Sequence, residues 1–161
     1  QAEALVQYLM DRLPLSDSMT IFDVYSGVGL FSAFLAPRVK KCIGIEASAT
    51  ACDDFAANLD ALDNVELYIG EAESILPNLQ DHADGVLLDP PRAGLAPAVI
   101  EALCQKKPEW IAYISCDPAT LARDIRKLSE GGYVLQWAAP FDLFPQTYHI
   151  ETVVCLQRKL T

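Results

Sequence analysis

The chain has 161 residues, 52% of them hydrophobic, which suffices for one domain over residues 1–161 with a substantial buried core. Its formal net charge of −10 argues against tight nucleic-acid binding by this chain alone, because phosphate contacts need clustered lysine and arginine. No apolar run reaches the length of a membrane span and no secretory leader is evident, so we expect a cytoplasmic protein without membrane contact. Five cysteines without a C-x-x-C spacing argue against a disulfide framework and a metal site.

A helical pattern opens the chain. Leu5, Leu9 and Leu13 recur every four residues before a proline, which predicts an amphipathic helix over Ala2 to Leu13 that covers one face of a sheet. The pattern starts directly after Gln1 rather than after a methionine, so we expect a fragment of a longer protein that lacks its upstream part. We expect the chain to be monomeric.

Short apolar strands then alternate with helices. Five strands are predicted at Thr20 to Tyr25, Lys41 to Glu46, Val65 to Gly70, Gly85 to Asp89 and Trp110 to Ser115. The helices between and after them are predicted at Leu30 to Ala36, from the Ser48 cap to Leu62, Ala98 to Gln105 and Leu121 to Glu130, with only a short connection before the fourth strand. Two final strands, Tyr133 to Trp137 and Thr147 to Leu156, have no helix between them. The pattern predicts an open, doubly wound α/β sheet of seven strands, mostly parallel, with an antiparallel C-terminal end.

A glycine turn between the first strand and its helix marks a candidate cofactor site. The run Asp23-Val24-Tyr25-Ser26-Gly27-Val28-Gly29 lets a ligand approach backbone at a helix N-terminus, although a purely structural turn is an alternative. Glu46 ends the second strand 19 residues after Gly27, where a carboxylate can bind ribose hydroxyls. A dinucleotide site would want a third glycine where Ser32 stands, so the pattern favours the S-adenosylmethionine methyltransferase version of this fold over NAD binding. Glu71, past the third strand, is either an adenine contact or an exposed surface residue.

A proline-rich turn follows the fourth strand at the carboxyl edge, where α/β sheets bind ligands. It reads Asp89-Pro90-Pro91-Arg92, and its prolines stiffen the loop and remove backbone donors. Methyltransferases that act on exocyclic amines tend to place an aromatic residue where Arg92 stands, so the target is not expected to be an amine. A structural Asp-Pro turn is the alternative interpretation.

Cys116 lies where the fifth strand should end and a helix begin. Asp117 is the predicted N-cap and Pro118 the first helical residue. The positive end of the helix dipole favours a thiolate, whereas the Asp117 carboxylate opposes it. We interpret Cys116 as a nucleophile; a small buried hydrophobic residue is the alternative.

With DVYSGVG, DPPRAG, SCDPATLARD and FPQTYHIE in this order, the chain resembles the catalytic domain of RNA uracil-C5 methyltransferases, which make 5-methyluridine in ribosomal or transfer RNA. The resemblance covers nearly the whole chain, and the cysteine motif and FP-x-T-x-H-x-E are specific to that family. It implies S-adenosylmethionine as cofactor, RNA as substrate, Cys116 as nucleophile at uracil C6 and Glu151 as the base that takes the C5 proton. The candidate cofactor-binding residues are Asp23, Tyr25, Gly27, Gly29, Glu46, Glu71 and Asp89, and the candidate substrate-binding residues are Pro90, Pro91, Arg92 and Asp117.

Three features depart from that family. Asp117 stands where Asn is usual, and Ser26 stands where Cys is frequent. The family's upstream Gln-containing cofactor motif and RNA-binding β-barrel are absent from the sequence, so we expect RNA binding to depend mainly on the missing upstream part. His149 shares a strand face with Glu151 and either orients it or packs. The alternatives are an RNA cytosine-C5 methyltransferase, although the Pro-Cys pair usual in those enzymes is absent, and a non-catalytic module that binds cofactor or RNA.

Overall fold

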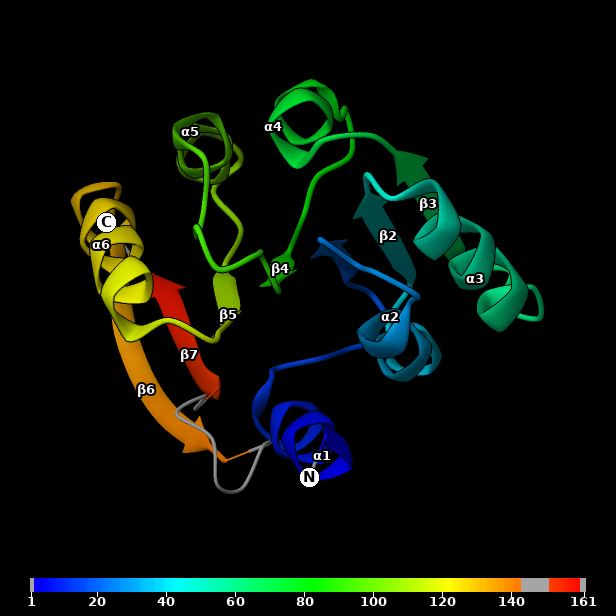
Figure 1. Ribbon diagram of the computed structural model, residues 1–161, viewed down its shortest axis with the longest axis horizontal. Coiled ribbons are helices and arrows are strands. Elements are labelled where there is room, and N and C mark those ends of the chain that lie inside the picture. Colours follow the sequence, from blue (N-terminus) through cyan, green and yellow to red (C-terminus); the bar gives the residue numbers. More distant parts are fainter. Residues whose placement is uncertain (1, 143–150, 160–161) are drawn as a thin grey trace.

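Seven strands form one sheet in the order β3-β2-β1-β4-β5-β7-β6 (Figure 1). The computed structural model describes residues 2–142 and 151–159. Strands β1 to β5 are parallel, and β7 runs antiparallel to both of its neighbours. The strands are β1 (Thr20–Val24), β2 (Lys41–Glu46), β3 (Val65–Ile69), β4 (Gly85–Leu88), β5 (Trp110–Ser115), β6 (Tyr133–Phe141) and β7 (Glu151–Arg158).

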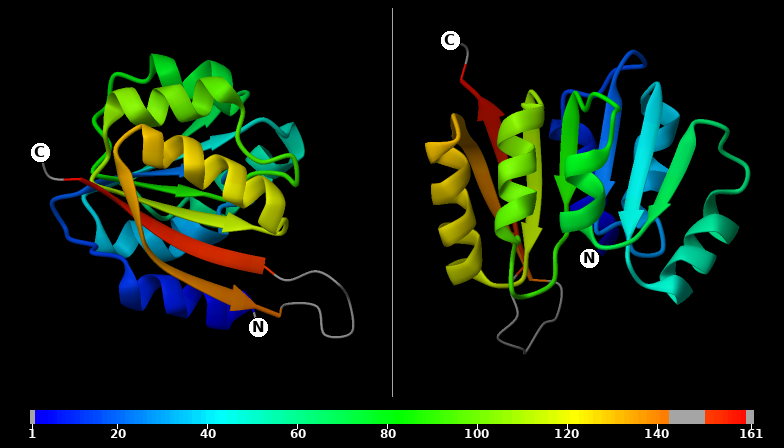
Figure 2. Two further views of the ribbon diagram at one scale, coloured as in Figure 1. Left: turned by 90° about the vertical axis from the view of Figure 1, so that its left-hand side faces the viewer. Right: turned by 90° about the horizontal axis from the view of Figure 1, so that it is seen from above.

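Helices cover both faces of this sheet (Figure 2). They are α1 (Ala2–Arg12), α2 (Leu30–Leu35), α3 (Ala49–Leu59), α4 (Ala72–Ile75), α5 (Pro97–Lys106) and α6 (Pro118–Glu130), with 3₁₀ turns η1 (Ala36–Arg38) and η2 (Leu76–Asn78). One apolar cluster joins α1 and α2 to one face, and a second joins α4, α5 and α6 to the other. Strands β4 and β5 are buried along their whole length between these layers, which explains their nearly continuous apolar sequences. In the described part of the chain, no helix is long and apolar enough to cross a membrane.

The doubly wound, mostly parallel sheet with an antiparallel end is confirmed, with three local differences. The connection before β4, predicted to be short, contains α4 and η2, which are too brief to show a helical period in the sequence. Strand β6 runs on to Phe141 through a register shift between Leu135 and Trp137. The predicted last strand began at Thr147; its first residues lie outside the described part, and β7 begins at Glu151.

The strand order places several chain segments at one edge. Strand β1 lies between β2 and β4, so the connections that leave β1 and β4 diverge to opposite faces of the sheet. Ligands of open α/β sheets bind in the crevice at such a switch point, outside the carboxyl ends of the strands. Because β7 is antiparallel to β5, its first residue comes to the same edge as the last residue of β5.

Candidate functional site

The glycine turn after β1 has an unusual backbone. Tyr25, Gly27 and Gly29 have φ values of 65°, 54° and 86°, a region that side chains disfavour. The backbone N–H groups of Tyr25 and Ser26 both donate to the Ile45 carbonyl, at 2.9 and 3.0 Å, which ties the turn to the end of β2. A strained tyrosine held in place in this way is typical of functional turns.

The two glycines of the turn differ in what surrounds them. A Cβ atom added at Gly27 would meet no atom within 4 Å. A Cβ added at Gly29 would lie 2.8 Å from Leu59 Cδ1 and 2.9 Å from Phe55 Cδ2. Gly27 therefore leaves open space for a ligand, whereas Gly29 is required for packing of α2 against α3.

Glu46 connects the end of β2 to this turn. One carboxylate oxygen accepts the Gly27 N–H at 2.8 Å, and the other accepts the Ser48 N–H at 2.7 Å. These bonds fix the orientation of the carboxylate, and each oxygen keeps a second lone pair for a further donor. Glu46 is thus held beside the open side of Gly27, as expected of an acidic residue that binds hydroxyl groups.

Asp23 is a fully buried carboxyl group under the turn. Its Oδ2 accepts the Ser32 hydroxyl at 2.6 Å, so the serine at the dinucleotide-type glycine position is engaged with Asp23. Its Oδ1 has no hydrogen-bond partner in the described structure. Burial raises the pKa of Asp23 to about 6, the Ser32 bonds oppose the rise, and the Glu46 charge adds to it. One buried acceptor oxygen below the glycine turn is therefore left without a partner in the described structure.

Asp89 directly follows β4 and lies among other carboxyl groups. Burial raises the pKa of Asp89 to about 7, and the negative charges of Asp23 and Glu151 add to the rise. Asp89 is nevertheless exposed at the surface, so solvent screening limits this rise. Carboxyl groups from the ends of β1 and β4 and the start of β7 therefore influence one another at this edge.

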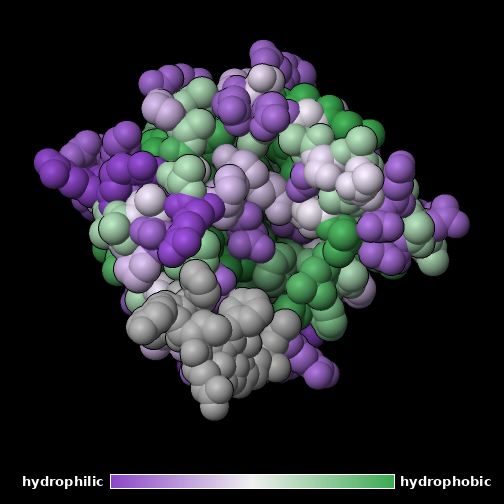
Figure 3. Space-filling view, in the orientation of Figure 1, coloured by the Kyte–Doolittle hydropathy of each residue, from purple (hydrophilic) through white to green (hydrophobic). Residues whose placement is uncertain are grey.

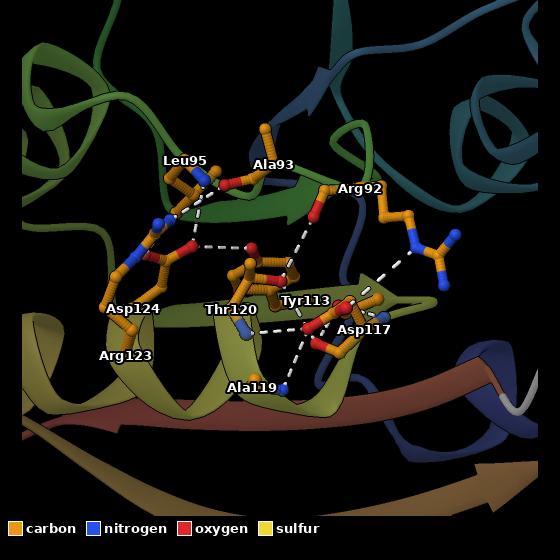
Figure 4. A network of polar contacts seen from close by, with 10 residues as sticks. Arg92, Ala93, Leu95, Tyr113, Asp117, Ala119, Thr120, Arg123 and Asp124 are labelled. Atoms are coloured by element: carbon orange, nitrogen blue, oxygen red, sulfur yellow. Dashed lines mark hydrogen bonds and ion pairs between the residues drawn. The ribbon is translucent and has the colours of Figure 1, made fainter.

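Cys116 follows β5 and is half-buried with a free thiol. The predicted cap is confirmed: Asp117 Oδ1 accepts the backbone N–H groups of Ala119 and Thr120, both at 2.9 Å (Figure 4). Arg92 Nε lies 3.9 Å from Asp117 Oδ2. The Thr120 N–H contributes most to lowering the pKa of Asp117, with Arg92 adding to the effect. The negative charge next to Cys116 is therefore partly compensated by helix amides and by the arginine of the proline-rich turn.

Glu151 reaches the same edge through strand pairing. Ser115 pairs with Thr152 in the antiparallel register of β5 and β7, so the next residues outward are Cys116 and Glu151. Glu151 also pairs with Phe141 of β6. The two residues predicted as nucleophile and base, 35 positions apart in the sequence, therefore come together at one end of neighbouring strands. His149 lies outside the described residues.

A cavity of about 290 Å³ opens between the glycine turn, the end of β3 and the loop after β4. It contains Tyr25 and Glu71, which were predicted as cofactor contacts. It also contains Glu73 and Arg123, which sequence reasoning did not assign to the site, because nothing local in α4 or α6 indicates that they face a common hollow. The lining residues are Tyr25, Glu71, Glu73, Pro91, Ala93, Gly94, Leu95, Ala96 and Arg123.

The surface near the glycine turn is apolar. Val28, Leu30 and Phe34 are each exposed over more than two fifths of their area. Figure 3 shows hydrophobic side chains gathered over α2 on this face, with hydrophilic ones on the side of α6.

Residues 2–159 match the tRNA (uracil-5-)-methyltransferase family. The chain belongs to this family. An uncharacterized RNA methyltransferase of Bacillus cereus is 39% identical, over 98% of this chain and 35% of the relative. One of Synechocystis is 41% identical, over 97% of this chain and 34% of the relative. The chain thus spans about a third of the length of these family relatives. The resemblance drawn from the sequence motifs is confirmed.

Solved structures agree with the family assignment. The Pyrococcus abyssi tRNA (uracil-54, C5)-methyltransferase, solved in complex with S-adenosyl-L-homocysteine, superposes with a TM-score of 0.84 at 33% identity, covering 97% of this chain and 38% of that one. The precorrin-6y C5,15-methyltransferase of Geobacter metallireducens has a TM-score of 0.80 at 17% identity, covering 96% of this chain and 88% of that one. At this low identity, the second similarity concerns the fold alone.

Proposed function

We propose that this chain forms the catalytic centre of an RNA methyltransferase that transfers a methyl group from S-adenosylmethionine to C5 of a uridine in ribosomal or transfer RNA. The observation that carries the proposal is the register of β5 and β7, which brings Cys116 and Glu151 to one edge beside Asp89. A thiol and a carboxylate in this arrangement suit addition to a pyrimidine followed by proton removal. Membership of the family and the tRNA-modifying relative from Pyrococcus abyssi support uracil as the base.

The residues at the glycine turn fit S-adenosylmethionine. Gly27 leaves its Cβ space open, Glu46 presents oriented lone pairs, and Asp23 Oδ1 lacks a partner in the described structure. The adjacent cavity of about 290 Å³ adds Tyr25 and Glu71. The bound cofactor would supply a methyl group that is electrophilic because it is attached to a sulfonium.

The chain's own residues then perform the covalent chemistry. The Cys116 thiolate forms a C–S bond at uracil C6, and the electrons of the C5–C6 double bond move onto C5, which accepts the methyl group. Glu151 removes the C5 proton. The electrons of that C–H bond restore the double bond while the C6–S bond breaks, and this returns Cys116 as a thiolate. Neither an oxidant nor a metal ion enters this balance.

Trapping with 5-fluorouridine RNA tests the proposal. With fluorine in place of the C5 hydrogen, no proton remains for the base to remove, so the cysteine cannot be eliminated and the methylated base should stay bonded to the thiol. We expect intact-protein mass spectrometry to show an adduct of RNA plus one methyl group, mapped by digestion to Cys116. The experiment uses this chain and, in parallel, the product of the whole gene. Failure of both to form an adduct, with cofactor present, would contradict uracil-C5 methylation.

Two glycine variants separate cofactor binding from folding. Gly27→Ala places a methyl group in open space, so we expect only about 1 kcal/mol of backbone strain, together with a loss of S-adenosylhomocysteine affinity of about tenfold. Gly29→Ala meets Leu59 and Phe55, so we expect it to lower the free energy of unfolding by about 1–3 kcal/mol. Denaturant unfolding and titration calorimetry measure the two effects. Equal affinity losses in folded samples of both variants would argue against a cofactor at Gly27.

A further inference from the structure

Asp124 of α6 is a carboxylate without any solvent exposure, on a helix whose outer face is strongly charged. Both of its oxygens are saturated. Oδ2 accepts the Leu95 N–H and the Tyr113 hydroxyl, each at 2.8 Å, and Oδ1 lies 2.9 Å from both Nε and Nη2 of Arg123. Burial, followed by the bond to Asp124, raises the pKa of Tyr113, so its hydroxyl stays a donor. A buried carboxylate that accepts from four donors holds the segments that carry those donors in fixed positions.

This junction belongs to a row of bonds between α6 and the loop after β4 (Figure 4). The Thr120 hydroxyl has two acceptors, the Asp117 carbonyl at 3.1 Å within its own helix turn and the Arg92 carbonyl of the loop at 3.3 Å. Arg123 Nη2 donates to the Ala93 carbonyl at 2.9 Å. The Leu95 N–H completes the row at Asp124. We call these three α6 residues, Thr120, Arg123 and Asp124, the α6 clamp.

The loop backbone lies in close contact with the α6 clamp. Gly94 has a φ of 76°, and a Cβ there would lie 2.5 Å from Asp124 Oδ2 and 2.7 Å from Arg123 Nη2. Glycine therefore allows the loop backbone to lie directly on the carboxylate and guanidinium. The held segment begins at Asp89 and includes Arg92. The helix that holds it begins at Pro118, two residues after Cys116.

A contribution to the stability of the fold does not by itself explain the α6 clamp. Asp124 is fully buried but the Arg123 side chain is 46% exposed, so solvent screening weakens their attraction, and desolvation of the carboxylate offsets much of the remainder. The directional bonds instead determine where the loop lies relative to α6. A displacement of about 1 Å at a reacting centre can lower the rate about 100-fold. The position of the loop relative to α6 is therefore important for the reaction.

We propose that Asp124 is a positioning residue, which fixes the loop of residues 89–95 relative to Cys116 and so sets the geometry between the target base and the thiol. The inference rests on the proposed uracil-C5 methylation. Asp124 contacts neither reacting atom; it acts through Leu95, Tyr113 and Arg123.

The test compares Asp124→Asn with Arg126→Gln in the product of the whole gene. Arg126 is an exposed residue of the same helix, and within residues 2–142 and 151–159 its side chain bonds to Glu130 rather than to the loop, so its variant is a matched control. The hydrogen-exchange rate of the peptide over residues 89–96 measures directly how firmly the α6 clamp holds the loop. Adduct formation with 5-fluorouridine RNA, measured at increasing RNA concentration, gives a maximal rate and a half-saturating concentration.

For Asp124→Asn we expect exchange at Leu95 to rise at least about tenfold and the maximal rate to fall about 100-fold, with half-saturation changed less than about threefold. Arg126→Gln should leave all three unchanged. A merely structural role would lower the melting temperature without changing the maximal rate of the folded protein. Unchanged exchange, or faster exchange with an unchanged maximal rate, would overturn the inference.

Two further outcomes can be distinguished from failure of this inference. If Asp124→Asn does not fold, Thr120→Val removes the hydroxyl that contacts both the Arg92 carbonyl of the loop and the Asp117 carbonyl of the first helical turn. A loss of about tenfold in maximal rate, together with faster exchange of the 89–96 peptide, is then expected. An unchanged rate in that variant would overturn the inference. If the unaltered protein forms no adduct, the proposed function fails, while hydrogen exchange still decides whether the clamp holds the loop.

Discussion

Replacing Cys116 with alanine should abolish methyl transfer. Without the thiolate no bond forms at uracil C6, and C5 is too weak a nucleophile to accept the methyl group. We expect turnover on uridine-containing RNA to fall at least about 10⁴-fold, with no covalent RNA adduct detectable. The measurement is transfer of a radiolabelled methyl group from S-adenosylmethionine, with S-adenosylhomocysteine affinity as evidence that the cofactor site is intact.

Cys104→Ala is the matched control for this prediction. Cys104 is a half-buried thiol on α5, whose sulfur lies toward Gly131 rather than toward the strand ends of the site. It should retain activity close to that of the unaltered protein. Residual turnover of Cys116→Ala within tenfold of the control would show that the reaction does not pass through this thiol.

Replacing Glu151 with glutamine should stop the reaction one step later. The adduct forms and is methylated, but no carboxylate takes the C5 proton, so Cys116 is not released. We expect turnover to fall about 10²–10⁴-fold while a methylated protein–RNA adduct accumulates on ordinary uridine RNA. Denaturing gel electrophoresis with RNA labelled at its end would reveal the adduct as a slowly migrating band.

Glu130→Gln provides the control carboxylate, because Glu130 lies at the other end of α6 and pairs with Arg126. It should turn over normally and trap no RNA. If Glu151→Gln lost activity without accumulating an adduct, Glu151 would act before or during addition of the thiol, and its assignment as the base that takes the C5 proton would be wrong.

Local sequence was sufficient for most of the fold. Apolar runs such as Trp110–Ser115 are buried on both faces, and Asp117 followed by proline marks a helix start by chemistry that acts within three residues. Helix α4 was missed because four residues cannot display a period of 3.6. The extension of β6 was missed because Pro140 discourages a strand assignment; β6 is an edge strand, where proline is tolerated.

The individual motifs of the site were predictable from the sequence, whereas the contacts between distant residues of the site were not. The glycine turn, the proline-rich turn and the cysteine are each contiguous motifs with a local signature. The bond between Leu95 and Asp124 joins residues 29 positions apart, and in the sequence Asp124 looks like one more charge on a polar helix. Only the packing of α6 against β5 and the loop after β4 shows that this charge is buried and paired.

The position of β7 has a consequence for synthesis on the ribosome. It is inserted between β5 and β6, although it follows both in the sequence. Until residues 151–158 have emerged, β5 presents an apolar, unpaired edge, and such edges promote association with other chains. Cys116, the proposed nucleophile, is therefore synthesised well before the strand that pairs with β5 and carries the proposed proton acceptor. A nascent chain arrested between β6 and β7 should need chaperone protection, and in such incomplete molecules Cys116 would be present without Glu151.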